Sequence, residues 1–305
     1  MSRSTKNVST AKRVGLGAMA AVVAMGLAAC GPSKQMEDEV EAQSEAEEVA
    51  ATQNTPEADA LPTLVPGKLT IATGDPAFSP WVENNDPESG EGLEAAVAYA
   101  VADQMGFAPE NVVWTRTPFD SVIAPGPKDF DMNIQQFSIT PERLEVVDFS
   151  SPYYVTTQGI LSIEGNPGWD AKTLADLKDV QFGVAAGSNA AAVIEEWVQP
   201  TKQIMVFNSN DDAVAALQQA HSIDAMVTDL PTVLYLAAAV VENGVVVGQF
   251  EAVEGDGDEF AFLLPQGSEL TPYVTEAVDA LRENGTLDQL ANVWLEVGAG
   301  APVIK

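Results

Sequence analysis

Alternation of strand and helix patterns between residues 68 and 294 constrains the fold most strongly. Short apolar runs, such as 223–227, alternate with segments whose apolar residues recur at helical spacing, such as 271–283. Such alternation predicts an α/β fold of mostly parallel sheets with helices on both faces. The alternation falls into two successive series, which predict two lobes. Ligands of such sheets bind beyond the carboxyl ends of the strands.

The expected elements follow from these patterns. We expect strands or extended segments at 68–73, 111–115, 130–134, 155–163, 181–185, 204–207, 223–227, 245–250 and 260–264. We expect helices at 93–105, 119–123, 140–143, 174–177, 188–197, 211–220, 231–241, 271–283 and 287–294.

Composition excludes several classes of function. The 305 residues are 46% hydrophobic, which suits a sizeable core, and carry 14 Lys and Arg against 45 Asp and Glu, a net charge of −31. A chain this acidic lacks the basic surface that nucleic acid needs, so no nucleic acid partner is expected. The single Cys, Cys30, allows no intramolecular disulfide, and the single His, His221, has no metal ligands spaced around it. We therefore expect no metal and no cofactor.

Residues 1–30 have the features of a lipoprotein signal peptide. Four bases precede an uncharged stretch of small and apolar residues, 14–29, that is short for a membrane span. Its end, Leu27-Ala28-Ala29-Cys30, resembles a bacterial lipobox, in which the Cys is lipidated and becomes the mature N-terminus. A plain secretory signal is the alternative. We expect Cys30 to carry lipid and to hold the protein, outside the cytoplasm, at the cell membrane.

Residues 31–66 are expected to form a disordered acidic tether. Nine acids stand against one base, Lys34, and aromatic residues are absent. Such a segment cannot bury enough apolar surface to offset the entropy of ordering it.

Arg143 is the most informative candidate for ligand binding. It falls in the first turn of a helix that begins with Thr140-Pro141, where the helix dipole disfavours a cation. An Arg beside a helix N-terminus forms a strong anion pocket. A surface salt bridge with Glu142, Glu145 or Asp148 is the alternative explanation.

Other candidates follow strands of the predicted sheets, and each has a simpler alternative. Backbone N–H groups of 187–189 are placed to bind a carboxylate or simply to start a helix. The carboxylate of Asp229 is placed to bind an ammonium group or to stabilise the turn before Pro231. Aromatic residues such as Phe78 are suited to clamp a ligand or to fill the core.

The order of motifs along the chain resembles a known family. The string Ser138-Ile139-Thr140-Pro141-Glu142-Arg143, followed by 147–154 (Val-Asp-Phe-Ser-Ser-Pro-Tyr-Tyr), is similar to the signature of extracytoplasmic solute-binding proteins for polar amino acids. These proteins are the binding subunits of ABC importers. Weaker matches at 174–178, 182–188, 224–229 and 284–294 extend the resemblance over residues 68–294.

The resemblance implies a two-lobed periplasmic-binding-protein-like fold with two hinge strands. Lobe 1 would comprise 67–155 and 259–305, and lobe 2 would comprise 157–254. The implied function is capture of a polar amino acid and its delivery to an ABC transporter permease by cleft closure. The implied protein is a monomer and not an enzyme.

The resemblance also implies the roles of individual residues. Arg143 would bind the ligand's carboxylate with help from Ser138, and Asp229 would bind its ammonium group from the other lobe. The further expected ligand-binding residues are Asp75, Phe78, Phe119, Gln136, Ser188 and Asn189. The family usually has small residues before Ser138, where this chain has Gln135 and Gln136.

Two alternative functions remain at this stage. One is an enzyme on the same scaffold, similar to cyclohexadienyl dehydratases, with Asp75 or Glu94 as general acid or base. The other is a sensory or adhesive lipoprotein, which would not close around a small ligand.

Overall fold

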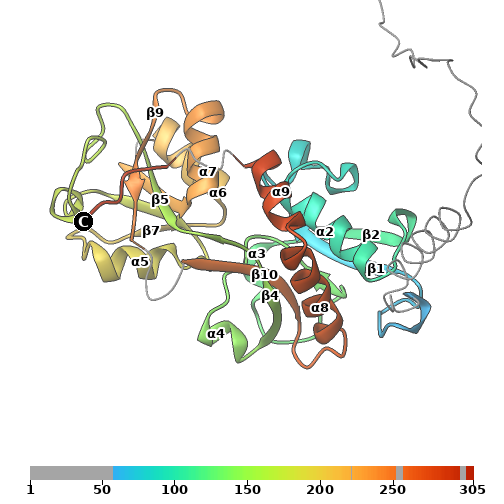
Figure 1. The fold of residues 1–305 in the computed structure, drawn as a ribbon. Coiled ribbons are helices and arrows are strands. Elements are labelled where there is room, and N and C mark those ends of the chain that lie inside the picture. The colour runs from blue at the N-terminus through green and yellow to red at the C-terminus, as the bar shows by residue number, and fades with distance from the viewer. Residues whose placement is uncertain (1–57, 221, 252–256, 296–299) are drawn as a thin grey trace, which may run out of the picture. The chain divides into compact units, whose positions relative to one another are not determined.

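The computed structural model describes residues 58–220, 222–251, 257–295 and 300–305. Within them, two five-stranded sheets form two lobes that lie side by side (Figure 1). The expected signal peptide, Cys30, most of the expected tether and His221 lie outside the described residues.

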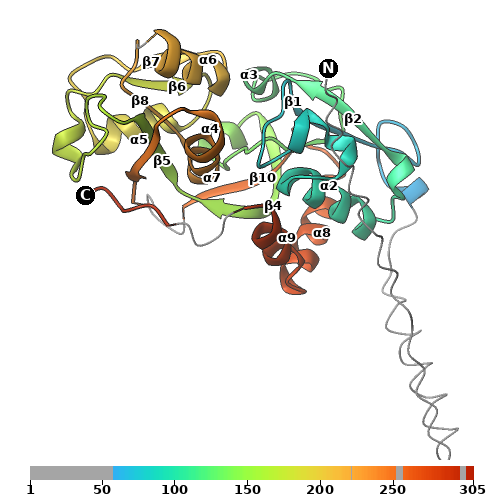
Figure 2. The same cartoon turned by 90° about the horizontal axis from the view of Figure 1, so that it is seen from above.

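Lobe 1 is built on the sheet order β2-β1-β3-β10-β4. Its strands are β1 (Leu69–Gly74), β2 (Val112–Thr117), β3 (Met132–Asn133), β4 (Val147–Thr156) and β10 (Asp258–Pro265). Its α-helices are α2 (Leu93–Gln104), α3 (Phe119–Val122), α4 (Pro141–Leu144), α8 (Thr271–Glu283) and α9 (Thr286–Trp294). Figure 2 shows α2, α8 and α9 gathered beside one another, where their apolar faces share one core with the sheet.

Lobe 2 is built on the sheet order β7-β6-β8-β5-β9. Its strands are β5 (Gln158–Ile163), β6 (Phe182–Ala185), β7 (Met205–Phe207), β8 (Ala225–Asp229) and β9 (Gly244–Gln249). Its α-helices are α5 (Ala190–Trp197), α6 (Asn210–Ala215) and α7 (Leu230–Tyr235). Helices α6 and α7 continue into the π-helical turns η6 (Ala216–Ala220) and η7 (Leu236–Val240).

Short 3₁₀ helices occupy several connections between these elements. They are η1 (Ala58–Ala60), η2 (Glu83–Asn85), η3 (Pro87–Ser89), η4 (Pro109–Asn111) and η5 (Leu174–Leu177).

The sheets are mixed, so the expectation of mostly parallel sheets is wrong. β1 pairs parallel with β2 and β3, and β6 pairs parallel with β7 and β8. β10 runs antiparallel to β3 and β4, and β5 runs antiparallel to β8 and β9. The pair β4–β10 is antiparallel because these two strands carry the chain between the lobes in opposite directions.

The single extended segment expected at 155–163 belongs to two strands. β4 begins at Val147 and pairs with β10 in lobe 1, whereas β5 begins at Gln158 and pairs with β8 and β9 in lobe 2. Thr157 lies between them and belongs to neither strand. One β-rich run therefore crosses from lobe to lobe.

Two expected boundaries also differ from the structure. Residues 58–66, expected in the tether, pack on lobe 1: Leu61 is 5% exposed in its core, and the carboxylate of Asp131 accepts a hydrogen bond from the backbone of Leu64 at 2.7 Å. The last residues, expected in lobe 1, pair with lobe 2. The backbone of Gln249 bonds to Pro302 and Ile304, and Ile304 is buried in the lobe 2 core.

Candidate functional site

A cavity of about 150 Å³ lies between the two lobes. Its walls come from residues at or just after the carboxyl ends of β1, β2 and β3 in lobe 1 and of β6, β7 and β8 in lobe 2. This is the position that the strand–helix alternation predicts for a ligand.

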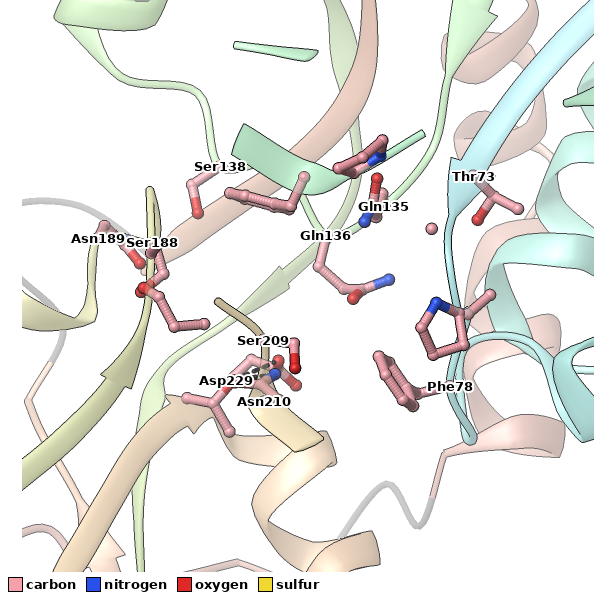
Figure 3. Close-up of a pocket in the computed structure, with 18 of the residues that line it drawn as sticks. Thr73, Phe78, Gln135, Gln136, Ser138, Ser188, Asn189, Ser209, Asn210 and Asp229 are labelled. Carbon is pink, nitrogen blue, oxygen red and sulfur yellow. Dashed lines mark hydrogen bonds between the residues drawn. The ribbon is translucent and has the colours of Figure 1, made fainter. Parts of the chain in front are cut away.

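All nine residues expected to bind ligand line this one cavity. They are Asp75, Phe78, Phe119, Gln136, Ser138, Arg143, Ser188, Asn189 and Asp229. In Figure 3, Ser138, Ser188 and Asn189 lie on one side of the site, Thr73 and Phe78 on the other, and Asp229 below them beside Asn210.

Arg143 is buried and spans the gap between the lobes. One guanidinium nitrogen donates to the carbonyl of Ser138 at 2.7 Å, and another donates to the carbonyl of Gly187, in lobe 2, at 2.9 Å. The helix start is fixed by Thr140, whose hydroxyl accepts from the Arg143 amide at 3.3 Å. No salt bridge among the described residues involves Arg143, so the structure does not support the alternative of a surface ion pair.

Aromatic rings hold the guanidinium in place. The rings of Phe119 and Phe137 stack with centroids 4.6 Å apart, and the guanidinium carbon of Arg143 lies 5.6 Å and 6.0 Å from these two centroids. Burial lowers the pKa of Arg143, and the negative charges of Asp258 and Glu142 offset part of that effect. A guanidinium remains charged under these conditions, so the site holds a fixed cation.

Asp229 is the last residue of β8 and supplies the buried carboxylate of lobe 2. One carboxylate oxygen accepts from the backbone N–H of Thr232 at 2.8 Å, and the other accepts from the Thr228 hydroxyl at 3.3 Å. Burial raises the pKa of Asp229 from 3.8 to about 6, although these hydrogen bonds favour the charged form. Asp229 therefore caps α7 and stabilises the turn before Pro231, which was the alternative to ligand binding. It also faces the cavity, so the two roles are compatible.

Side-chain hydrogen bonds hold the Gly187-Ser188-Asn189 turn, but none of them caps the following helix, α5. The Ser188 hydroxyl donates to the carbonyl of Ala185 at 2.7 Å, and Asn189 makes no side-chain capping bond to α5. The Asn189 amide donates instead to Asp258 at 2.6 Å. Gly187 has φ +75°, and a Cβ there would lie 3.1 Å from Ile123, so a glycine suits this crossing of the lobes.

Glu94 is a supporting residue that the sequence analysis raised only as a possible acid or base. It is fully buried on α2, and its carboxylate accepts from the Gln136 backbone at 2.7 Å, from the Gln136 side-chain amide and from the Tyr153 hydroxyl. Burial raises its pKa from 4.5 to about 7, with repulsion from Asp229 adding to the effect. Gln136 adopts a left-handed conformation, φ +50°, and the bonds to Glu94 hold it there.

Sequence reasoning missed several polar residues of the wall. They are Thr73, Gln135, Gln158, Asn208, Ser209, Asn210 and Thr228. Their position at or beside strand ends was the available signal, but polar residues are common at such places in any α/β protein.

Two features are absent from the described residues. No group of three or more His, Cys, Asp or Glu residues there is arranged to hold a metal ion. Nor does any helix of that part of the chain have the length and apolar character needed to span a bilayer.

Comparisons with known proteins identify the family. The glutamate-binding protein GluB of Corynebacterium efficiens is 31% identical over 75% of this chain and 76% of its own length. An ancestral arginine-binding protein bound to arginine superposes with a TM-score of 0.62 at 27% identity, over 75% of this chain and 98% of its own. The ancestral amino acid-binding protein AncCDT-1, a precursor of cyclohexadienyl dehydratase, gives a TM-score of 0.61 at 29% identity, over 75% and 95%.

These likenesses agree with the match to a family profile. The profile of the bacterial extracellular solute-binding proteins, family 3, matches residues 69–297. The two-lobed α/β fold expected from the sequence is confirmed. The chain belongs to the bacterial extracellular solute-binding proteins of family 3.

Proposed function

We propose that this protein captures an amino acid outside the cytoplasmic membrane and delivers it to an ABC transporter permease. The observation that carries the proposal is one cavity with a buried cation and a buried carboxylate on opposite lobes, Arg143 and Asp229. An amino acid carries one charge of each sign on adjacent groups, so it can bridge this pair. The similar proteins include a glutamate-binding protein and an arginine-binding protein, which supports the same ligand class.

The proposed contacts divide the ligand between the lobes. Arg143 and Ser138 bind the carboxylate from lobe 1, and Ser188 and Asn189 add contacts from lobe 2. Two of the five guanidinium N–H groups are engaged with carbonyls, so others remain to meet a carboxylate. Asp229 binds the ammonium group. Phe78 and Phe119 enclose the side chain, with Gln136 and Asp75 near its end.

Cleft closure follows from this division. Contacts with both walls form only when the lobes are together, so the ligand binds the closed form more tightly and shifts the population towards it. Charge-assisted hydrogen bonds of this kind contribute about 1.5–3 kcal/mol each. The closed form is then the form that the permease recognises.

The proposal includes anchoring through Cys30 and a monomeric state. A lipid-modified Cys30, followed by an acidic tether, would keep the binding lobes near the membrane that holds the permease.

We also propose that the protein acts by binding and not by catalysis. Glu94, the carboxyl with a pKa of about 7, already accepts three hydrogen bonds and is not among the residues that line the cavity. A general acid needs reach to the substrate as well as a suitable pKa. Incubation with prephenate or arogenate, both substrates of cyclohexadienyl dehydratases, should yield no product.

The central test is the variant Arg143→Ala. A thermal-shift screen of the common L-amino acids first identifies the tightest ligand of the wild type, since binding raises the apparent stability. Calorimetry with that amino acid should show a loss of at least about 100-fold in affinity, because its carboxylate would be buried without a partner. Circular dichroism should show the fold retained.

The matched control is Arg282→Ala. This Arg lies on α8, where it pairs with Asp279 at the surface and does not line the cavity. Its replacement should leave amino-acid affinity within about twofold of the wild type. Unchanged affinity in Arg143→Ala, or no shift with any amino acid, would refute the proposed function.

A further inference from the structure

The charges around the cavity are unbalanced towards the negative. Among the described residues that line it, the ionisable ones are Asp75, Arg143 and Asp229, so Arg143 is the single cation of that part of the wall. Two more carboxylates stand directly behind the wall. Glu94 accepts hydrogen bonds from Gln136, and Asp258 accepts them from Gln158 and Asn189.

A bound zwitterion does not remove this imbalance. Its carboxylate is matched by Arg143 and its ammonium group by Asp229, which leaves Asp75, Asp258 and the ionised form of Glu94 without a cation from the ligand backbone. Arg143 already feels the charge of Asp258, and Glu94 feels the charge of Asp229 across the cleft. Further positive charge in the cavity is therefore favourable, and a further carboxylate would be buried without a partner.

Unpaired acceptors in the wall point to a ligand that donates hydrogen bonds. Among the described residues, the side-chain oxygens of Thr73, Gln135 and Gln158 are buried and have no hydrogen-bond partner, and all three residues line the cavity. Buried acceptors are rarely left unpaired in native proteins. Groups with several N–H donors, such as ammonium and guanidinium, can satisfy all three oxygens, whereas a carboxylate, which only accepts, cannot satisfy the two glutamine oxygens.

The remaining surface suits the stem of a basic side chain. Figure 3 places Phe78 opposite Gln136, with Thr73 and Gln135 close by, so one end of the site combines an aromatic face with polar groups. Asp75 belongs to the same loop as Phe78, after β1, and is exposed where the cavity meets solvent. An aliphatic stem packs on the ring while its charged end reaches the carboxylate.

We propose that the ligand is an L-amino acid with a basic side chain, whose cationic end lies against Asp75. This inference rests on the proposed function and narrows its ligand class: the site selects against acidic side chains and prefers a cation to its neutral isostere.

The test compares matched ligands by calorimetry on the full chain. The ligands are L-arginine, L-lysine, L-citrulline, L-glutamine and L-glutamate, with citrulline as the neutral isostere of arginine. We expect arginine or lysine to bind most tightly, arginine to bind at least about tenfold more tightly than citrulline, and glutamate to show no measurable binding.

The outcomes separate this inference from the function on which it rests. Tighter binding of glutamine, glutamate or citrulline than of both basic ligands would overturn the basic class while leaving amino-acid capture intact. Failure of every amino acid in the wider screen would overturn both.

A pair of variants tests the position of the cationic end. Asp75→Asn should reduce the preference for arginine over citrulline several-fold. Asp103→Asn removes the same charge from an exposed position on α2, outside the cavity lining, and should retain the preference. An equal preference in Asp75→Asn and in the wild type would overturn the placement of the cation at Asp75.

Discussion

Two buried carboxyl groups lie on different lobes, Asp229 in the cavity wall and Glu94 behind it, and burial raises the pKa of both. Tyr153 and Tyr154 stand near them, and their own pKa values are raised as well, mainly by burial. A raised carboxyl pKa means that folding favours the protonated form. The stability that this contributes is present at low pH and is lost as pH rises towards about 6 for Asp229 and about 7 for Glu94.

Ligand affinity should change with pH in the opposite direction. The ligand's ammonium group needs the charged form of Asp229, so affinity should rise with pH up to about 7 and fall by up to about tenfold for each pH unit below 6. Calorimetry between pH 5 and 7.5, in buffers of different ionisation enthalpy, should show proton release on binding below pH 6.

Variants assign this dependence to a residue. Asp229→Asn should bind ligand weakly, and its affinity should no longer depend on pH below 6. Any change of affinity near pH 7 that is present in the wild type and absent in Glu94→Gln is assigned to Glu94. Affinity that increases as pH falls would contradict the assignment of Asp229 to the ammonium group.

At the scale of elements, the start of α7 joins stability to ligand binding. The side chain of Asp229 caps this helix through the Thr232 amide and also lines the cavity. One carboxylate therefore serves a structural role and a proposed binding role.

Two substitutions separate these roles. Asn is a good helix cap without charge, so Asp229→Asn should lose ligand affinity yet remain about 1 kcal/mol more stable than Asp229→Ala, which loses the cap. Urea unfolding of both ligand-free variants measures the difference in the free energy of unfolding. Equal stability of the two would show that the cap does not support α7.

The sequence predicted the elements with strong local patterns. The helices expected at 93–105 and 271–283 correspond closely to α2 and α8, because apolar residues recur at helical spacing in both. The division of 155–163 between the lobes was not predictable, because β-forming residues flank Thr157 on both sides. Only the partner strands, β10 for one part and β8 and β9 for the other, decide where each part belongs.

The site was predictable to a similar extent. Its nine expected residues came largely from the family resemblance, and the structure brings them to one cavity. The support from Glu94 could not be foreseen, because its partners, Gln136 and Tyr153, are 42 and 59 residues away along the chain. Such contacts are determined by tertiary packing and leave no local pattern.

For the whole molecule, a hydrogen bond from a tryptophan also joins the two lobes, in addition to those made by Arg143, Gln158 and Asn189. The indole N–H of Trp81, in lobe 1, donates to the Thr232 hydroxyl of lobe 2 at 2.8 Å. Trp81 is 1% exposed and packs edge-on against Tyr154 and Phe260. Since Thr232 also holds Asp229, this contact links closure of the lobes to the carboxylate proposed to bind ammonium.

Trp81→Phe should weaken ligand binding about fivefold. It keeps an aromatic ring but removes a hydrogen bond of about 1 kcal/mol that the closed form alone can make. Calorimetry measures the affinity, and small-angle scattering with and without ligand measures closure. Trp114→Phe is the matched control, because the Trp114 indole bonds to Tyr99 within lobe 1. Wild-type affinity in Trp81→Phe would exclude this contact as a determinant of closure.

The path of the chain at its carboxyl end has a practical consequence for measuring motion. Trp294 ends α9 on lobe 1, whereas Ile304 is buried in lobe 2. A fluorophore on Val293, whose side chain is 71% exposed, and a second fluorophore at Lys305 would therefore report on different lobes. Energy transfer between these dyes would follow the hinge in real time.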